Sequence, residues 1–460
     1  MKNENPTAAE RCLAFIDESV SAFHAVENIE NRLIQQGFRE LKESSRWEIS
    51  PGEGYFVKRN DSSLIAFRIP SAEAKGFHIV ASHSDSPCFK LKAGDETLVE
   101  KSYVKLNVEP YGGMIYATWL DRSLSVAGRL VCREGDRLVS RTVNIDEDLL
   151  VIPNLAIHLD REMNKSLAYN PQVDLQPLLS VCPAREEREG EGASDEKNGQ
   201  DPKERSNILM KKAASYAGVE ESDILGKDLY LYVRDRGRLA GAEKELMISP
   251  RLDDLECVFA SVESFLEDEP GEYVSVCAVF DNEEVGSQTK QGAASTFLKD
   301  TLERIGEGLD KPGSEYRRML AESFMISADN AHGVHPNHPE KSEPCAKPYL
   351  NQGIVIKFHG GQKYTTDGYS EAVMRDICLR AKVPCQSYCN RSDIAGGSTL
   401  GNVSSSQVSI PAVDIGLPQL SMHSPYETAG VMDTCYLTKV AAHFYSACIR
   451  AGEGGCYEVV

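Results

Sequence analysis

The sequence lacks any long hydrophobic run and any excess of basic residues. No stretch approaches the roughly 18 uncharged apolar residues that span a bilayer. Lysine and arginine together number 50 against 70 aspartate and glutamate, so the formal net charge is −20. Binding to nucleic acid depends on clustered Lys and Arg facing the phosphates, and this balance argues against such a partner. We therefore expect neither a membrane nor a nucleic acid as partner.

Two features of secreted and zinc-finger proteins are also missing. The N-terminus reads MKNEN and lacks the basic-then-apolar order of a signal peptide, so we expect a cytoplasmic location. The 13 cysteines are odd in number and include no CxxC pair of the kind that holds zinc. In a reducing compartment such cysteines are mostly small buried hydrophobic residues, and we interpret them in this way.

What the sequence does contain is the composition of a globular protein of two or three domains. Of its 460 residues, 41% are hydrophobic and 26% charged. Predicted strands and helices alternate over 236–460, which favours an α/β domain completed by residues 1–90. Short alternating segments over 91–235 predict an inserted β-rich domain. Within it, 185–206 is almost wholly polar, and we expect a mobile acidic loop.

Several predicted strands of the α/β part end in side chains that bind metals. The strands and the residues that follow them are 77–81 with His83 and Asp85, 273–280 with Glu283 and Glu284, 324–327 with Asp329, and 410–415 with His423. Because ligands gather at the carboxyl ends of the strands in an open parallel sheet, these side chains are predicted to converge. Asp253 begins a predicted helix that can face the same place.

The residue types at these strand ends suit a metal-dependent hydrolase. Two histidines with three carboxylates form a mixed nitrogen and oxygen set that binds Zn²⁺, and also Mn²⁺ or Co²⁺. Five such ligands suffice for two metals if one carboxylate bridges them. Asp85 can accept the second ring N–H of His83 and so fix its tautomer. A carboxylate close to the reacting water can take its proton and pass it to a leaving amine.

Each of these motifs has a simpler explanation when taken alone. The His83–Asp85 pair is common in loops, and Glu283 with Glu284 is typical of a solvated surface. Asp253 follows Arg251 closely and can be its ion-pair partner or a helix cap. Placed together at strand ends, they favour a two-metal hydrolase.

Six sequence blocks in order carry a family resemblance. They are SHSDSP at 82–87, IPNLAIHL at 152–159, RLDD at 251–254, FDNEEVGS at 280–287, SADNAH at 327–332 and MHS at 422–424. Through them the chain resembles the aspartyl aminopeptidase family of di-zinc peptidases from end to end. The resemblance implies a three-layer αβα catalytic domain with a mixed, largely parallel sheet, interrupted by a β-rich dimerisation domain.

The resemblance also implies a role for each residue of the predicted site. The implied metal ligands are His83 and Asp329 on one zinc, Glu284 and His423 on the other, and Asp253 bridging the two. Glu283 would be the general base, with Asp85 behind His83. The expected reaction is hydrolysis of the N-terminal residue of a peptide by a two-metal-activated water.

Specificity and assembly are further implications of the resemblance. Lys357 matches a lysine that binds acidic side chains, so the expected substrates begin with Asp or Glu, although it can also be a solvated strand-end lysine. His332 and His335 can line the site or serve structurally. The family assembles as a tetrahedral dodecamer built from dimers. In it the residue matching His158 reaches a neighbouring subunit's site, whereas the simpler interpretation is a core or interface histidine.

Three other functions stay open from the sequence. The chain can be an aminopeptidase of neutral N-terminal residues. It can also be another di-metal hydrolase, such as a deacylase, or a silent scaffold. A deacylase or a carboxypeptidase-like enzyme recognises a carboxylate terminus through an arginine or a similar group, in place of a free amine.

Overall fold

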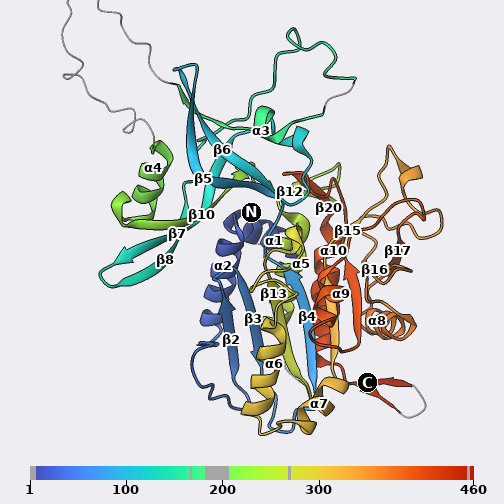
Figure 1. Cartoon of the computed structure of the whole chain (residues 1–460). Coiled ribbons are helices and arrows are strands. Elements are labelled where there is room, and N and C mark those ends of the chain that lie inside the picture. The colour runs from blue at the N-terminus through green and yellow to red at the C-terminus, as the bar shows by residue number, and fades with distance from the viewer. Residues whose placement is uncertain (1–6, 166–167, 182–206, 268–270, 453–455) are drawn as a thin grey trace, which may run out of the picture. The chain divides into compact units, whose positions relative to one another are not determined.

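The computed structural model describes residues 7–165, 168–181, 207–267, 271–452 and 456–460 (Figure 1). The predicted acidic loop 185–206 lies outside these residues. The chain divides into two compact units. Unit 1 comprises Met1–Ser86 with Arg236–Val460, and unit 2 comprises Pro87–Asp235.

Unit 1 is built on a mixed sheet in which we count nine strands over the described ranges. Their order is β1 (Arg39–Leu41), β2 (Gly54–Arg59), β3 (Ser63–Arg68), β13 (Val274–Phe280), β4 (Phe77–His83), β14 (Phe324–Ala328), β18 (Ala412–Gly416), β16 (Ile354–Phe358) and β17 (Cys385–Cys389). The central strands β13, β4, β14 and β18 are parallel to one another. Their sequences are near-continuous apolar runs because both faces of a parallel sheet are covered by helices. This confirms the predicted α/β class with a mixed, largely parallel sheet.

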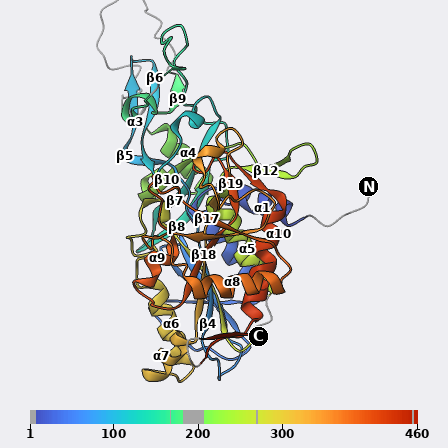
Figure 2. The ribbon, with the colours of Figure 1, turned by 90° about the vertical axis from the view of Figure 1, so that its right-hand side faces the viewer.

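Helices cover both faces of this sheet. One hydrophobic core joins it to α1 (Ala8–Glu18), α2 (Ala22–Gln35), α5 (Leu252–Glu267), α8 (Gly368–Arg380) and α10 (Val431–Ser446). A second core joins the other face to α6 (Phe297–Gly308), α7 (Ser314–Ala321) and α9 (Leu400–Ser405). In Figure 2, α6 and α9 lie to the left of the strands and α5 and α10 to the right. Successive strand residues such as Ile79 and Val80 enter opposite cores, so the unit has the three predicted layers.

A second, smaller sheet of unit 1 positions several site residues. Its order is β11 (Arg238–Ala240), β12 (Leu246–Ser249), β20 (Glu427–Gly430), β19 (Pro418–Leu420) and β15 (Ala331–His332). Strand β12 leads into Asp253, the β19–β20 connection carries His423, and β15 begins two residues after Asp329. The sheet therefore joins three segments that are far apart in the sequence. Strands β21 (Ile449–Ala451) and β22 (Tyr457–Val459) pair separately near the C-terminus.

Unit 2 is built on an antiparallel sheet. In order its strands are β8 (Arg137–Asn144), β7 (Leu124–Glu134), β10 (Ile224–Val233), β5 (Cys88–Val99), β6 (Tyr103–Tyr111) and β9 (Leu178–Val181). Helix α4 (Ile208–Ala217) packs into its core around Phe89 and Trp119, and α3 (Pro171–Asp174) is a single turn. Across both units, no described helix has the length and apolar character that crossing a bilayer requires.

Candidate metal centre

The carboxyl ends of three neighbouring strands bring predicted site residues together. His83 is the last residue of β4, and Asp329 directly follows β14. Glu283 opens the short helix η3 (Glu283–Val285), three residues after the end of β13. Since β13, β4 and β14 are parallel neighbours, their ends share one edge of the sheet. The convergence that the strand pattern predicts is therefore present in the structure.

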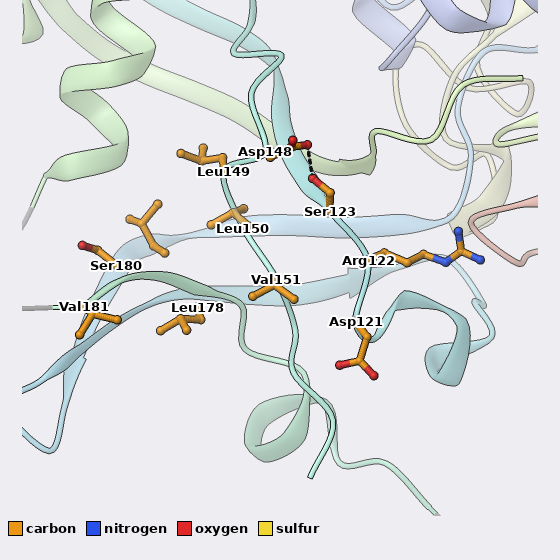
Figure 3. Close-up of a pocket in the computed structure, with 11 residues that line it drawn as sticks. Asp121, Arg122, Ser123, Asp148, Leu149, Leu150, Val151, Leu178, Ser180 and Val181 are labelled. Carbon is orange, nitrogen blue, oxygen red and sulfur yellow. Dashed lines mark hydrogen bonds between the residues drawn. The ribbon is translucent and has the colours of Figure 1, made fainter. Parts of the chain in front are cut away.

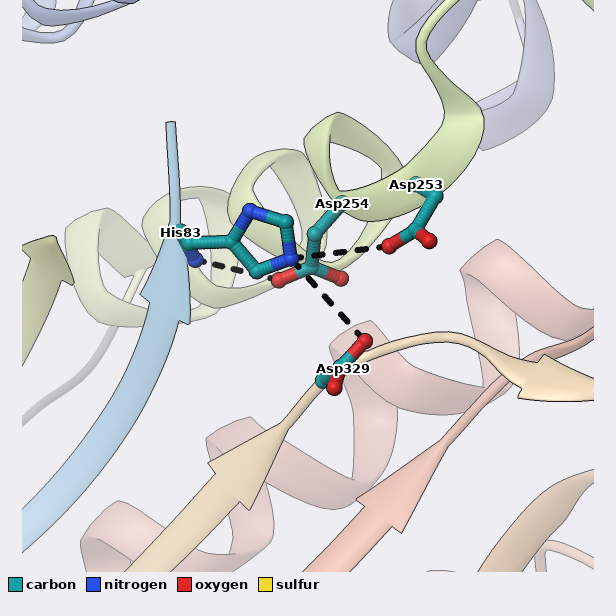
Figure 4. Close-up of side chains that lie close together, drawn as sticks. All are labelled: His83, Asp253, Asp254 and Asp329. Carbon is teal, nitrogen blue, oxygen red and sulfur yellow. Dashed lines mark hydrogen bonds and ion pairs between the residues drawn. The ribbon is translucent and has the colours of Figure 1, made fainter. Parts of the chain in front are cut away.

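Asp253 lies between the two histidines of the cluster. Its Oδ1 is 3.5 Å from Nε2 of His83, and its Oδ2 is 3.4 Å from Nε2 of His423. Each histidine also has a second carboxylate beside it. Asp329 Oδ1 lies 3.9 Å from His83 Nε2, and Glu284 Oε2 lies 3.5 Å from His423 Nε2. Figure 4 shows the His83 side, with Asp253 and Asp329 approaching one edge of the imidazole.

Asp85 supports the cluster in a way that differs in detail from the sequence interpretation. The backbone oxygen of Asp85 lies 3.0 Å from Nδ1 of His83, closer than its carboxylate Oδ1 at 3.4 Å. The carboxylate oxygens accept the backbone N–H groups of Glu283 at 3.1 Å and Glu284 at 3.2 Å. Asp85 therefore orients the His83 ring and also anchors the turn that carries both glutamates.

The cluster concentrates negative charge in a buried place. Its carboxylates are Asp253, Asp254, Glu283, Glu284 and Asp329. Burial, reinforced by neighbouring carboxylates, raises the pKa of Glu283 to about 8 and also raises the pKa of Glu284. Burial acts to raise the pKa of Asp253 as well, but the flanking imidazoles outweigh it and hold this pKa below its ordinary value.

These residues fit divalent metal ions. Groups of them place one ligand atom each within 4.8 Å of the others, as with Asp253, Glu284 and His423. Asp253 Oδ1 and Asp254 Oδ1 are buried and accept no hydrogen bond from any part of the chain that the structure describes. A buried carboxylate oxygen that accepts no hydrogen bond is costly unless a cation faces it. Imidazole nitrogens with carboxylate oxygens are also the donor set that zinc prefers.

Lys357 lies inside this arrangement. It is 3% exposed, its Nζ donates to the backbone oxygen of Asn330 at 2.8 Å, and it lies 3.5 Å from Asp329 Oδ2. Burial acts to lower the pKa of Lys357, but the charge of Asp329 outweighs it and raises this pKa, so the ammonium stays protonated. Its nearest charged partner is thus a predicted metal ligand.

The other predicted histidines lie in different surroundings. His332 ends β15 and has exposed surface, but the protein around its ring excludes much of the water. This desolvation, followed by the positive charge of Lys357, lowers the pKa of His332. His335 accepts the backbone N–H of Asn337 at 3.2 Å and lies beside the ring of His338. Over the described ranges, no hydrogen bond or ion pair joins His335 to the cluster. His158 belongs to unit 2 and is exposed.

Sequence reasoning missed two acidic residues of the site. Asp254, next to Asp253, accepts the backbone N–H of His83 at 3.1 Å (Figure 4). Glu427 is 2% exposed and binds the backbones of both Asp253 and His423. The Asp-Asp pair was a visible signal for the first. Nothing in the local sequence marks the second, because its partners include a residue 174 positions away.

Two histidines and several buried carboxylates, gathered at the carboxyl ends of a parallel α/β sheet, are typical of metal-dependent hydrolases. Residues 15–445 match the family model described as Aminopeptidase I zinc metalloprotease (M18). The chain belongs to this family and is a zinc-dependent aminopeptidase.

Relatives cover nearly the whole chain. It is 44% identical over 450 residues to a "Probable M18 family aminopeptidase 2" of Clostridium acetobutylicum, covering 97% of this chain and 100% of the relative. It is 33% identical over 454 residues to an "Aspartyl aminopeptidase" of Caenorhabditis elegans, covering 95% of each.

Solved structures of similar proteins share the fold. A chain in the cryo-EM structure of the Ape4 and Nbr1 complex aligns with a TM-score of 0.87 at 36% identity, covering 95% of this chain and 85% of that one. A chain of the yeast mApe1 dodecamer aligns with a TM-score of 0.79 at 27% identity, covering 95% of this chain and 96% of that chain.

Proposed function

We propose that this aminopeptidase removes acidic N-terminal residues, Asp or Glu, from peptides through a site for two zinc ions. The observation that carries the two-ion proposal is the Asp253 carboxylate, whose oxygens face the imidazoles of His83 and His423 at 3.5 and 3.4 Å. A carboxylate between two imidazoles is suited to bridging two cations. The remaining carboxylates supply each side with a further ligand.

The proposed ligands divide between the two sides of Asp253. His83 and Asp329 hold one ion, and Glu284 and His423 hold the other, with Mn²⁺ or Co²⁺ as possible replacements. When bound, two such ions polarise the scissile carbonyl and make water a nucleophile at neutral pH. The ligands stay ordered because Asp85 holds the Glu283–Glu284 turn and the edge of the sheet holds His83.

Glu283 is the proposed general base. It belongs to a group with His83 and Glu284 whose ligand atoms lie within 4.8 Å of one another, so its carboxylate is close to both sides of the site. An ionised Glu283 accepts a proton from the attacking water and returns it to the nitrogen of the departing amine. Its backbone is fixed by Asp85, which limits the positions that this carboxylate reaches.

The proposed preference for acidic residues rests on Lys357 and on one relative. The enzyme's net charge of −20 does not attract acidic peptides, so recognition of Asp or Glu requires a local cation. Lys357 is a buried ammonium beside Asp329, and the relative from Caenorhabditis elegans is called an aspartyl aminopeptidase. A specificity role requires that the ammonium also reach the substrate while it contacts Asp329.

The variant Lys357→Met tests this specificity. A charge-assisted hydrogen bond contributes about 1.5–3 kcal/mol, so kcat/KM for Asp- and Glu-nitroanilides should fall about 10–100-fold more than for Ala- and Leu-nitroanilides. Lys58→Met is the matched control. Lys58 pairs with Glu30 at 2.6 Å outside the cluster, and its replacement should leave the ratio unchanged.

Equal losses on acidic and neutral substrates would mean that Lys357 only neutralises Asp329. The same panel separates the other functions. Cleavage of N-acyl amino acids in place of aminoacyl-nitroanilides would indicate a deacylase, and a purified chain without bound metal or activity would indicate a scaffold.

We also propose that the chain forms a homo-oligomer, a tetrahedral dodecamer built from dimers, with unit 2 as the dimerisation domain. A similar solved structure is described as a dodecamer. Unit 2 exposes apolar side chains next to His158, with Leu155 54% and Leu159 74% exposed. It also carries a hollow of about 470 Å³ (Figure 3), whose lining mixes apolar side chains such as Leu178 and Val181 with charged ones such as Asp121. Exposed apolar surface of this kind is typical of an interaction site.

If His158 completes the site of a neighbouring subunit, two inactive variants should complement each other. His158→Ala and Glu283→Gln are each expected to be nearly inactive. Oligomers co-assembled from both should regain activity, because some sites then combine an intact Glu283 with an intact His158 from another chain. Mixing the purified variants without reassembly is the control. No recovery in verified mixed oligomers would contradict the role of His158.

A further inference from the structure

A buried carboxylate outside the proposed ligand set connects two of its members. Glu427 begins β20, and its backbone is held opposite Ser249 of β12. Its Oε1 accepts the backbone N–H of His423 at 2.8 Å, and its Oε2 accepts the backbone N–H of Asp253 at 3.0 Å. One rigid, planar group therefore holds the backbones of two residues that come from distant parts of the sequence.

The backbones that Glu427 holds are not otherwise in regular structure. His423 has φ +67°, in the left-handed region that residues other than glycine rarely adopt. Asp253 has φ −80° and ψ 109°, outside the helical region although it stands at the start of α5. Neither residue lies in regular helical or strand geometry, and the hydrogen bonds to Glu427 tie their two backbones to one side chain.

Glu427 is itself held by a buried chain of amides. Gln419 Nε2 donates to Glu427 Oε1 at 3.3 Å, and Gln419 Oε1 accepts from Asn330 Nδ2 at 2.8 Å. Asn330 Nδ2 also lies 3.1 Å from the backbone oxygen of Leu252, the residue before Asp253. Gln419 and Asn330 are 1% and 2% exposed, so water does not compete for these bonds.

We propose that Glu427 is a positioning residue, which sets the relation of Asp253 to His423 and thereby the affinity of their shared metal site. The inference rests on the proposed ligand roles of these two residues. Glu427 acts through their backbone amides and does not itself contact the metal. Its two oxygens must both accept, which a carboxylate does and a carboxamide does not.

The variant Glu427→Gln tests the role with almost no change in shape. If the amide oxygen of the new glutamine accepts from His423 and Gln419, its NH₂ group faces the backbone N–H of Asp253. If the amide is turned the other way, its NH₂ group faces the two donors from His423 and Gln419. Loss of such a supporting contact typically lowers metal affinity about 10–100-fold. We expect this loss for one of the two zinc ions, measured on the full chain by titration with zinc against a chromophoric chelator.

Asp433→Asn is the matched control. Asp433 is also buried and accepts two backbone N–H groups, from Asn351 at 2.6 Å and Gly353 at 3.0 Å, but it contacts none of the proposed ligands. Both variants should melt at a lower temperature, and only Glu427→Gln should bind zinc more weakly. A Glu427→Gln protein that loses stability but binds zinc like the wild type would overturn the positioning role.

Two further variants make the outcome decisive. His423→Ala must lose one zinc ion. If His423→Ala binds zinc like the wild type, the ligand assignment fails and the role of Glu427 fails with it. If His423→Ala binds zinc more weakly but Glu427→Gln does not, only the role of Glu427 is overturned. Should Glu427→Gln not fold, Gln419→Met loosens the same carboxylate from one side. It is expected to weaken zinc binding in the same direction, and unchanged affinity in folded Gln419→Met would overturn the proposal.

Discussion

Replacing Glu283 by Gln is expected to lower kcat about 10²–10⁴-fold, the usual contribution of a general acid or base, while both zinc ions stay bound. The amide keeps the size of the side chain and leaves untouched the backbone N–H that Asp85 accepts at 3.1 Å. It cannot take a proton from water. The measurement combines steady-state kinetics on an aminoacyl-nitroanilide with metal analysis of the same preparation.

The neighbouring residue provides the contrast. Glu284→Gln should lose metal as well as activity, because Glu284 Oε2 lies 3.5 Å from the imidazole of His423, a proposed ligand of the same ion. Comparison of the two variants would then distinguish a residue that transfers a proton from a residue that binds metal. Near-native turnover of Glu283→Gln would refute its assignment, and loss of zinc from it would make Glu283 a ligand.

Among single substitutions of the cluster, Asp253→Asn is expected to cause the largest loss of bound zinc and of activity. Its carboxylate faces both imidazoles, so the change weakens both proposed metal positions at once. Zinc content should fall below two ions per chain, and kcat/KM should fall by about 10³-fold or more, since metal ions contribute several kcal/mol to such reactions. Inductively coupled plasma analysis and kinetics at added zinc measure the two effects.

Asp254→Asn is the matched change one residue later. Asp254 accepts the backbone N–H of His83 at 3.1 Å, and an asparagine oxygen can accept that bond as well. We therefore expect Asp254→Asn to keep both zinc ions and most of the activity. If Asp254→Asn were the more damaging variant, the bridging role would belong to Asp254.

The sequence was most informative where structure follows from hydrophobic runs. Strands 77–81, 273–280 and 324–327 are predicted as buried apolar segments of a parallel sheet, and the structure has them as β4, β13 and β14. Their directions in such a sheet then predicted that His83 and Asp329 would meet. This part of the site follows from chain order and sheet geometry alone.

The supporting contacts could not be predicted in the same way. The second sheet has strands of two to four residues, such as β15 and β20, which are too short to show periodicity. Glu427 acts on backbone N–H groups, which every residue except proline carries, so no side-chain pattern marks its partners. The contact of His83 Nδ1 with the backbone oxygen of Asp85 is likewise invisible in the sequence, because every residue carries a backbone oxygen.

The division of unit 1 has a consequence for the order of synthesis. His83 lies in the first fifth of the chain and His423 in the last tenth, and all of unit 2 is made between His83 and Asp253. Unit 2 is continuous in sequence and can fold while the ribosome still makes the rest, as domains generally do. The metal cluster cannot form until almost the last residue emerges, so a growing chain is not yet a peptidase. Premature termination anywhere before His423 would release a product that lacks part of the proposed ligand set.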